Sequence, residues 1–160
     1  EGELWVGLQA IQNPGNLGTI LRTCDAVGAT HVLLLDDCTD PYDPAAVKAS
    51  MGSIFTVRLT KTHAEAFRAW HAQHAEMKIV GTSDHADEDY AQTVYPQTCL
   101  LLMGSERQGL SNEYIQLCAK MVRIPMEGAC DSLNLAVATG IILYQIYNQR
   151  RNIFKSAGQQ

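Results

Sequence analysis

A turn containing proline and glycine at residues 13–16 connects an expected strand to an expected helix, and polar residues follow it. Asn16 is suited to cap the helix, because its side chain can accept a hydrogen bond from an early backbone N–H. Arg22 falls in the second turn of the same helix, among otherwise apolar residues. The glycines do not match G-x-G-x-x-G, so a dinucleotide site is not supported. The segment alone leaves two interpretations open, a binding site or a capped helix with a structural arginine.

A second glycine-containing segment, residues 103–111, directly follows the most apolar run of the chain. Ligands of open α/β sheets bind beyond the carboxyl ends of strands, which makes this segment a candidate binding loop. Gly104 and Gly109 allow the backbone to approach a ligand closely or to take a positive φ. Their spacing matches a phosphate-binding loop, but Leu110 stands where that loop needs lysine, and Glu106 would repel a triphosphate. Phosphate binding is therefore not expected here.

Residues 124–136 form a third segment, in which a strand ends, a loop with proline and glycine follows, and a helix begins. Capping of that helix by Asp131 or Ser132 would explain part of its polar cluster. Asn134 is harder to explain in this way, because asparagine is a mediocre helix former. Each of the three segments thus places polar side chains just after a strand, where parallel sheets hold their ligand sites.

Short apolar runs alternate with longer segments of helical spacing along the whole chain. Strands are expected at residues 4–8, 31–35, 54–59, 78–81, 99–103 and 121–124. Helices are expected at residues 16–27, 44–49, 62–76, 112–119 and 133–147. This alternation predicts an α/β fold with a mostly parallel sheet flanked by helices.

The chain of 160 residues has the length of one domain and carries a net charge of −5. Eight acidic residues lie in two short stretches without Lys or Arg, so the remainder, counted without those eight, carries +3 rather than −5. The residues of these stretches are Asp36, Asp37, Asp40, Asp43, Asp84, Asp87, Glu88 and Asp89. The acidity therefore belongs to two expected loops, and a small electrostatic footprint for nucleic acid remains.

Five cysteines, odd in number and without a C-x-x-C pair, are expected to be reduced thiols that act as small core hydrophobes. The five histidines show no metal-ligand spacing, so no metal site is expected. No apolar run reaches the roughly 18 residues that a membrane span needs. The acidic N-terminus lacks the basic start of a signal peptide. We therefore expect a cytoplasmic protein that is not embedded in a membrane.

Taken together and in this order, the three segments resemble the motifs of the SpoU (TrmH-like) branch of the SPOUT RNA methyltransferases. The family pattern N-x-G-x-x-x-R is matched by Asn16, Gly18 and Arg22. The pattern G-x-E-x-x-G is matched by Gly104, Glu106 and Gly109. The pattern I-P-M…S-L-N is matched by residues 124–126 and 132–134. Residues 48–53 also resemble the family's segment between the first two motifs, and the whole resemblance spans about residues 4–149.

The resemblance implies a fold and a cofactor. Its fold is an α/β domain whose C-terminal segment forms a deep trefoil knot, and the loops of the knot bind S-adenosyl-L-methionine. The chain as a whole, residues 1–160, would be a single SpoU-type domain. The residues that the resemblance assigns to the cofactor site are Thr82, Gly104, Gly109, Ile124, Met126 and Leu133.

The resemblance also implies a reaction, the transfer of a methyl group from this cofactor to a ribose 2′-hydroxyl of RNA. The residues that it places in the catalytic machinery are Arg22, Asn16, Glu106, Ser132 and Asn134. A guanidinium stays protonated at neutral pH and is a poor base. We therefore expect Arg22 to bind the neighbouring phosphate and stabilise the developing alkoxide, although a phosphate-assisted proton relay stays open.

Family members are typically homodimers, and the resemblance implies a dimer through the C-terminal helix, with each active site completed across the interface. The apolar run at residues 141–144 suits that role. Many relatives carry a separate N-terminal RNA-binding segment, which is expected to be absent from this chain. The first motif and the loop at residues 36–44 favour ribosomal RNA over transfer RNA as the substrate.

Three alternatives remain beside this interpretation. The first is a transfer-RNA 2′-O-methyltransferase. The second is a non-catalytic RNA-binding paralogue, which the retention of all the motif residues disfavours. The third is a dinucleotide-binding oxidoreductase, which the missing glycine fingerprint disfavours.

Overall fold

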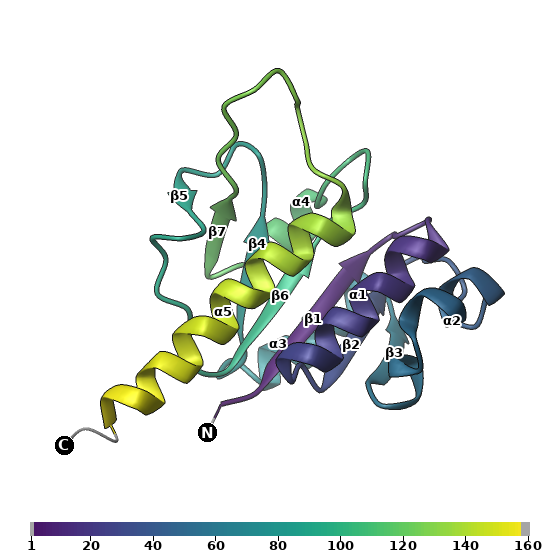
Figure 1. The fold of residues 1–160 in the computed structure, drawn as a ribbon, viewed down its shortest axis with the longest axis horizontal. Helices are drawn as coiled ribbons and strands as arrows, with labels where there is room; N and C mark the ends of the chain where they lie inside the picture. Colours follow the sequence, from purple (N-terminus) through teal and green to yellow (C-terminus); the bar gives the residue numbers. More distant parts are fainter. Residues whose placement is uncertain (1, 158–160) are drawn as a thin grey trace.

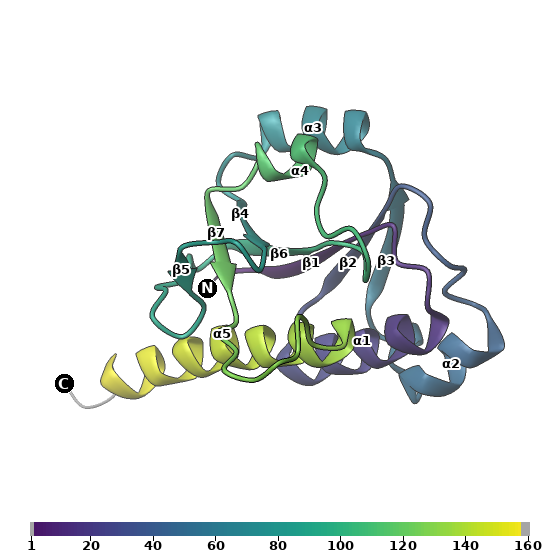
Figure 2. The ribbon, with the colours of Figure 1, turned by 90° about the horizontal axis from the view of Figure 1, so that it is seen from above.

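The computed structural model describes residues 2–157, and side chains up to residue 152. One sheet lies between two layers of helices (Figures 1 and 2). The strands are β1 (Leu4–Gln9), β2 (His31–Leu35), β3 (Arg58–Thr62), β4 (Lys78–Thr82), β5 (Glu88–Asp89), β6 (Cys99–Met103) and β7 (Lys120–Arg123). The helices are α1 (Pro14–Val27), α2 (Pro44–Ser50), the 3₁₀ helix η1 (Ser53–Phe55), α3 (Ala64–Gln73), α4 (Asn112–Ile115) and α5 (Leu135–Ala157).

The seven strands follow the order β3-β2-β1-β6-β4-β7-β5, and every pair is parallel. The chain moves outward from β1 through β2 to β3, then returns to the other side of β1 for the remaining strands. The strand order therefore reverses between β1 and β6, which is where α/β sheets open a crevice for ligands. The predicted α/β fold with a parallel sheet flanked by helices is confirmed.

Helices α1, α2 and α5 cover one face of the sheet, and α3 and α4 cover the other (Figure 2). All five residues of β6 are buried, because apolar layers cover this strand on both faces. Helices α1 and α5 lie side by side on the first face (Figure 1), where Leu17, Ile20 and Ile142 belong to the same apolar cluster. The family's trefoil knot, expected in the C-terminal part of the chain, stays a prediction.

The prediction of a strand at residues 54–59 is wrong in its start, because β3 begins only at Arg58. Ile54 and Val57 are both buried at helical spacing, whereas Phe55 between them is 81% exposed. The chain turns at Met51 and Gly52, which both have positive φ, and continues as η1 before β3 begins at Arg58. A one-turn helix therefore uses the apolar residues that alternation had assigned to a strand.

The helix expected at residues 112–119 is also wrong in its length, since α4 ends at Ile115. Its continuation tightens into turns in which the N–H groups of Leu117 and Cys118 bond to carbonyls three residues back. The Ala119 N–H then bonds to the Ile79 carbonyl and brings the chain into the sheet as β7. The long helix expected at 133–147 begins at Leu135 and extends to Ala157. The short strand β5 lies in a segment expected to be a loop.

Candidate active site

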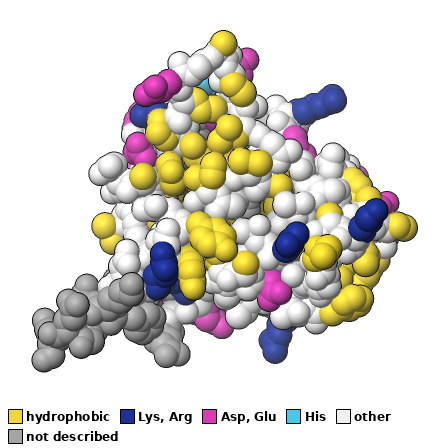
Figure 3. Space-filling view, viewed as in Figure 1, with side chains coloured by type: hydrophobic (Ala, Val, Ile, Leu, Met, Phe, Trp, Pro, Cys, Tyr) yellow, Lys and Arg dark blue, Asp and Glu magenta, His cyan; other side chains and the backbone are white. Residues whose placement is uncertain are grey.

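A cavity of about 550 Å³ opens at the carboxyl edge of the sheet, beside β4, β6 and β7. The loops that follow these strands form its walls, and the start of α5 closes it. Figure 3 shows hydrophobic side chains gathered over β4, β7 and the loop after β7 on this side of the molecule. All six residues that the sequence assigned to a cofactor site line this cavity: Thr82, Gly104, Gly109, Ile124, Met126 and Leu133.

The loop from Gly104 to Leu110 folds tightly on itself, which explains its two glycines. A Cβ atom on Gly104 would lie 2.1 Å from the carbonyl carbon of Gly109 and 2.3 Å from the Leu110 nitrogen, so the backbone would have to move. Gly109 has a φ of 65°, a conformation that favours glycine, and its N–H donates to the Ser105 carbonyl at 3.1 Å. This closed loop presents its backbone to the cavity and carries Glu106 at the rim.

Three polar side chains from the three sequence motifs meet beside this loop. The Asn16 amide Nδ2 donates to Glu106 Oε1 at 3.4 Å. The Asn134 amide Nδ2 donates to Asn16 Oδ1 at 3.1 Å. The chain of bonds therefore joins residues 90 and 118 positions apart in the sequence. Since Asn16 lies near the start of α1 and Asn134 just before α5, both side chains are held by helix ends.

The helix caps differ from the two that the sequence suggested. Asn13, not Asn16, caps α1, because its Oδ1 accepts the Asn16 backbone N–H at 2.9 Å and Pro14 occupies the first turn. Asn134 itself caps α5, with its Oδ1 accepting the backbone N–H groups of Ala136 at 2.9 Å and Val137 at 3.2 Å. Ser132 lines the cavity and makes no cap bond within the described residues.

Of the five predicted catalytic residues, Glu106 and Ser132 line the cavity, Asn16 and Asn134 bond in a chain to Glu106, and Arg22 does neither. Its side chain is exposed on α1, and it is not part of the cavity wall. Among the side chains described, those of residues 2–152, none bonds to its guanidinium. Its helix α1 packs beside α5 on the same face of the sheet.

Gly18 of the first motif has a packing role that the sequence did not reveal. A Cβ at this position would lie 2.2 Å from the Ala46 carbonyl oxygen and 2.7 Å from the Ala49 Cβ. The absence of a side chain therefore lets α1 and α2 approach closely. The segment at residues 48–53 contributes to the same contact, because Ser53 Oγ donates to Asp25 Oδ2 on α1 at 2.9 Å.

The cavity also contains ionisable residues that were not among the predicted site residues. Asp84 and His85 follow β4, Arg123 ends β7, and Arg107 lies in the glycine loop. Their position just after strands was the available signal. Among the described residues, no group of His, Cys, Asp and Glu could hold a metal ion. The mixed charges suit a polar or zwitterionic ligand rather than a metal or a triphosphate.

A pocket formed by the loops at the carboxyl ends of parallel strands is typical of α/β proteins that bind small ligands. Comparisons with known proteins identify the family to which the chain belongs. The model described as the SpoU rRNA Methylase family matches residues 3–144. The chain therefore belongs to the SpoU rRNA methylase family, and the family prediction is confirmed.

Two curated relatives are ribosomal-RNA enzymes by name. The chain is 38% identical over 143 residues to a 23S rRNA (uridine(2479)-2′-O)-methyltransferase of Streptomyces viridochromogenes, covering 86% of this chain and 50% of the relative. It is 34% identical over 143 residues to the 23S rRNA (guanosine-2′-O-)-methyltransferase RlmB of Vibrio vulnificus, covering 89% of this chain and 58% of the relative. The chain thus spans little more than half the length of these relatives.

A solved structure shows the same fold with a bound cofactor. The AdoMet-bound rRNA methyltransferase of Sinorhizobium meliloti has a TM-score of 0.88 and 40% identity to this chain. The match covers 93% of this chain and 57% of that structure. None of the helices within residues 2–157 is long and apolar enough to span a membrane.

Proposed function

We propose that this chain is the methyltransferase unit of an enzyme that methylates ribose 2′-hydroxyl groups of RNA with S-adenosyl-L-methionine. The observation that carries the proposal is the meeting of all three motifs beside one cavity, through the bonds of Asn16 to Glu106, a cavity residue, and of Asn134 to Asn16. Relatives that are 34–38% identical carry the corresponding activity in their names.

The cavity fits the proposed cofactor in size and chemistry. Its volume of about 550 Å³ is typical of a small-molecule site. Ile124, Met126 and Leu133 supply apolar surface for the adenine, and the backbone of the Gly104–Leu110 loop supplies polar groups. When bound, the cofactor supplies an activated methyl group. The residues of the chain then have to hold the RNA 2′-oxygen in line with that group and accept or relay one proton.

The hydrogen-bond geometry supports a separate role for each polar residue. Glu106 and Asn16 form an orienting pair at the cavity rim, and Asn134 fixes that pair to the end of α5. Ser132, exposed at the cavity wall, is free to contact the ribose. Arg22 binds the phosphate next to the target ribose and stabilises the negative charge that develops on the 2′-oxygen.

The exposed position of Arg22 supports a homodimer in which each active site takes this residue from the partner subunit. On the same face, α5 exposes the apolar residues Val137 (52%) and Tyr144 (44%). Figure 3 shows hydrophobic surface over the middle of α5, and a second copy packed there would cover it. In each subunit, Arg22 of α1 does not line the cavity. In such a dimer, Arg22 of one subunit would approach the cavity of the other.

Ribosomal RNA is the proposed substrate, in the cytoplasm, because the relatives above act on 23S rRNA by name. Their names differ in the methylated base, uridine in one and guanosine in the other. The target nucleotide is therefore set by features outside the shared motifs.

The test is the transfer of radiolabelled methyl groups from S-adenosyl-L-methionine to fragments of 23S rRNA and to transfer RNA. We expect transfer to ribosomal RNA, and calorimetric binding of the cofactor that Arg22→Ala leaves unchanged while it lowers turnover at least about a hundredfold. Turnover of Arg22→Ala within about threefold of the wild type would remove Arg22 from the mechanism. Cofactor binding without transfer to either RNA would favour the non-catalytic paralogue.

Mixed dimers test the shared active site directly. Arg22→Ala and Asn134→Ala subunits are each expected to be inactive alone. If each site combines Asn134 of one subunit with Arg22 of the other, random mixing restores about a quarter of the wild-type activity. If Arg22 serves its own subunit, no mixed dimer contains an intact site and activity stays absent.

A further inference from the structure

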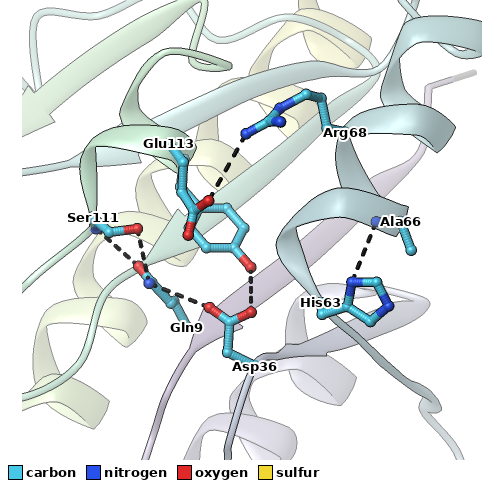
Figure 4. Close-up of polar contacts among 8 residues, drawn as sticks. Gln9, Asp36, His63, Ala66, Arg68, Ser111 and Glu113 are labelled. Carbon is cyan, nitrogen blue, oxygen red and sulfur yellow. Dashed lines mark hydrogen bonds and ion pairs between the residues drawn. The ribbon is translucent and has the colours of Figure 1, made fainter.

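A buried glutamine at the end of β1 holds the far end of the glycine loop. Gln9 is 9% exposed, and its side chain makes two bonds to Ser111 (Figure 4). Gln9 Oε1 accepts the Ser111 backbone N–H at 3.0 Å, and Gln9 Nε2 donates to Ser111 Oγ at 3.0 Å. Residues 9 and 111 are 102 positions apart, so this pair ties two distant segments together.

The location of Ser111 gives this pair its importance. The loop from Gly104 to Leu110 begins at the end of β6, where the sheet fixes it, and it ends at Ser111. Ser111 stands at the N-cap position of α4, yet its side chain makes no cap bond to that helix. Its hydroxyl bonds to Gln9 instead. Gln9 is therefore the side chain that attaches the second end of the loop to the central strand of the sheet.

Two further side chains fix the orientation of the Gln9 amide. Asp36 Oδ2 accepts from Gln9 Nε2 at 3.4 Å, and Asp36 Oδ1 accepts from the Tyr114 hydroxyl at 3.0 Å. The opposite amide orientation would set Oε1 against the carboxylate and Nε2 against the Ser111 N–H, so only one orientation is favourable. Tyr114 is fully buried, and burial together with the Asp36 bond raises the pKa of its hydroxyl, which keeps it a donor.

Backbone turns at the ends of the neighbouring strands β1 and β2 bring the Gln9 and Asp36 side chains together. Gln9 pairs with Leu35 in the sheet, and the residues that follow them, Ala10 and Asp36, both have positive φ, at 53° and 64°. The chain turns at both points, and the Gln9 and Asp36 side chains meet beside α4, as Figure 4 shows. A left-handed conformation at a residue other than glycine costs energy, so the surrounding contacts must hold it.

We propose that Gln9 is a positioning residue for the methyl transfer: through Ser111 it holds the Gly104–Leu110 loop, and with it Glu106, in the geometry that the reaction needs. Asp36 and Tyr114 keep the Gln9 amide in the required orientation. The inference rests on the proposed function. Gln9 itself is not part of the cavity wall.

The variant Gln9→Glu tests this proposal because it keeps the shape of the side chain. At about pH 8.5 its carboxylate would lie against that of Asp36, where Gln9 Nε2 now bonds to Asp36 Oδ2 at 3.4 Å, and the repulsion should move residue 9 away from Ser111 and loosen the loop. At about pH 6 the two carboxylates can share one proton, because each raises the pKa of the other. The shared proton replaces the repulsion between residues 9 and 36 by a hydrogen bond, so residue 9 stays beside Ser111. The other ionisable groups near the pair are Tyr114, Cys38, and Glu113 with its partner Arg68 at 3.8 Å.

We expect kcat of Gln9→Glu to be about tenfold below wild type at about pH 8.5 and within about threefold of it at about pH 6, while KM for RNA changes less than about twofold. Hydrogen exchange of residues 104–111 should be faster at the higher pH only. The double variant Gln9→Glu, Asp36→Asn should lose this pH dependence. The matched control is Gln12→Glu, since Gln12 donates to the carbonyls of Ala10 and Asp37 and does not contact the loop.

Several outcomes would overturn the inference. They are a Gln9→Glu enzyme with wild-type kcat at the higher pH, or equal loss at both pH values with unchanged exchange in residues 104–111. The same pH profile in Gln12→Glu would also overturn it. An inactive wild-type chain would instead contradict the proposed function, and the exchange data would still show whether Gln9 anchors the loop.

Discussion

Asn134 combines a structural task with a task at the site. Its Oδ1 caps α5 through two backbone N–H groups, and its Nδ2 donates to Asn16. An aspartate could cap the helix equally well but has no N–H for Asn16. The amide is therefore the side chain that satisfies both the helix end and the Asn16–Glu106 pair.

Two variants separate these tasks. Asn134→Asp should keep the stability of the wild type, because aspartate is a good N-cap, but lose about a hundredfold or more in kcat. Asn134→Ala should lose the same activity and also about 1 kcal/mol of stability. Urea unfolding and methyl-transfer kinetics measure the two effects. Equal stability of the two variants would show that the cap is unimportant.

The five cysteines are all free, as predicted, and they differ in their surroundings. Burial raises the pKa of the Cys24 and Cys118 thiols to about 12 and that of Cys99 to about 11. Burial also raises the pKa of Cys38. These four thiols stay protonated at neutral pH, and the thiolate is the reactive form.

Cys130 is the exposed exception, and it lies in the loop that ends at the cavity. Alkylation of the native protein at neutral pH should therefore modify Cys130 first, as mass spectrometry of peptides can show. The other four should react at a comparable rate only after unfolding in urea. Early modification of Cys24 or Cys99 in the native protein would contradict their burial in the core.

At the scale of elements, the contact of α1 with α2 depends on the missing side chain of Gly18. Gly18→Ala adds a methyl group 2.2 Å from a backbone oxygen of α2, so we expect a loss of about 1–3 kcal/mol from overpacking. The matched control is Gly140→Ala in α5, where the nearest atom lies at 3.9 Å. That change should stabilise the helix by up to about 1 kcal/mol. Urea midpoints that move in the same direction for both variants would contradict this account.

At the scale of the whole molecule, α5 extends from the cavity to the opposite edge of the sheet (Figure 1). Its start is capped beside the cavity, and near its other end Arg150 donates to the backbone carbonyls of Gly2, Glu3 and Gln97. Gly2 and Glu3 precede β1, and Gln97 precedes β6. One side chain therefore joins α5 to the entry of both central strands.

Arg150→Met should cost about 1–2 kcal/mol, because it retains the length of the side chain but removes the donor to the Gly2 and Gln97 carbonyls, while the Glu3 carbonyl keeps its bond from the Cys99 N–H. Arg150→Lys should recover part of that loss. The control is Arg151→Met, whose exposed guanidinium bonds to Asn148 Oδ1 at 2.8 Å, and its effect should stay within about 0.5 kcal/mol. Equal midpoints for the Arg150→Met and Arg151→Met variants in urea would show that the carbonyl contacts do not stabilise the fold.

The sequence alone determined the fold class, and its resemblance to the family named six residues that line the cavity. Apolar runs such as residues 99–103 and the glycines at 104 and 109 follow local rules of burial and backbone geometry, which a short segment expresses by itself. The same rules located the polar residues Asn16, Glu106 and Asn134, since each lies just after a strand or at a helix end.

Only the tertiary structure decided which distant residues touch. The bonds of Gln9 to Ser111 and of Arg150 to Gln97, and the exposure of Arg22 away from its own cavity, depend on strand order and helix placement. The helix turn at Ile54 likewise replaced an expected strand because the core required Ile54 and Val57 on one side. Local sequence patterns do not predict these contacts, because the free energy that favours them comes from packing between segments far apart in the chain.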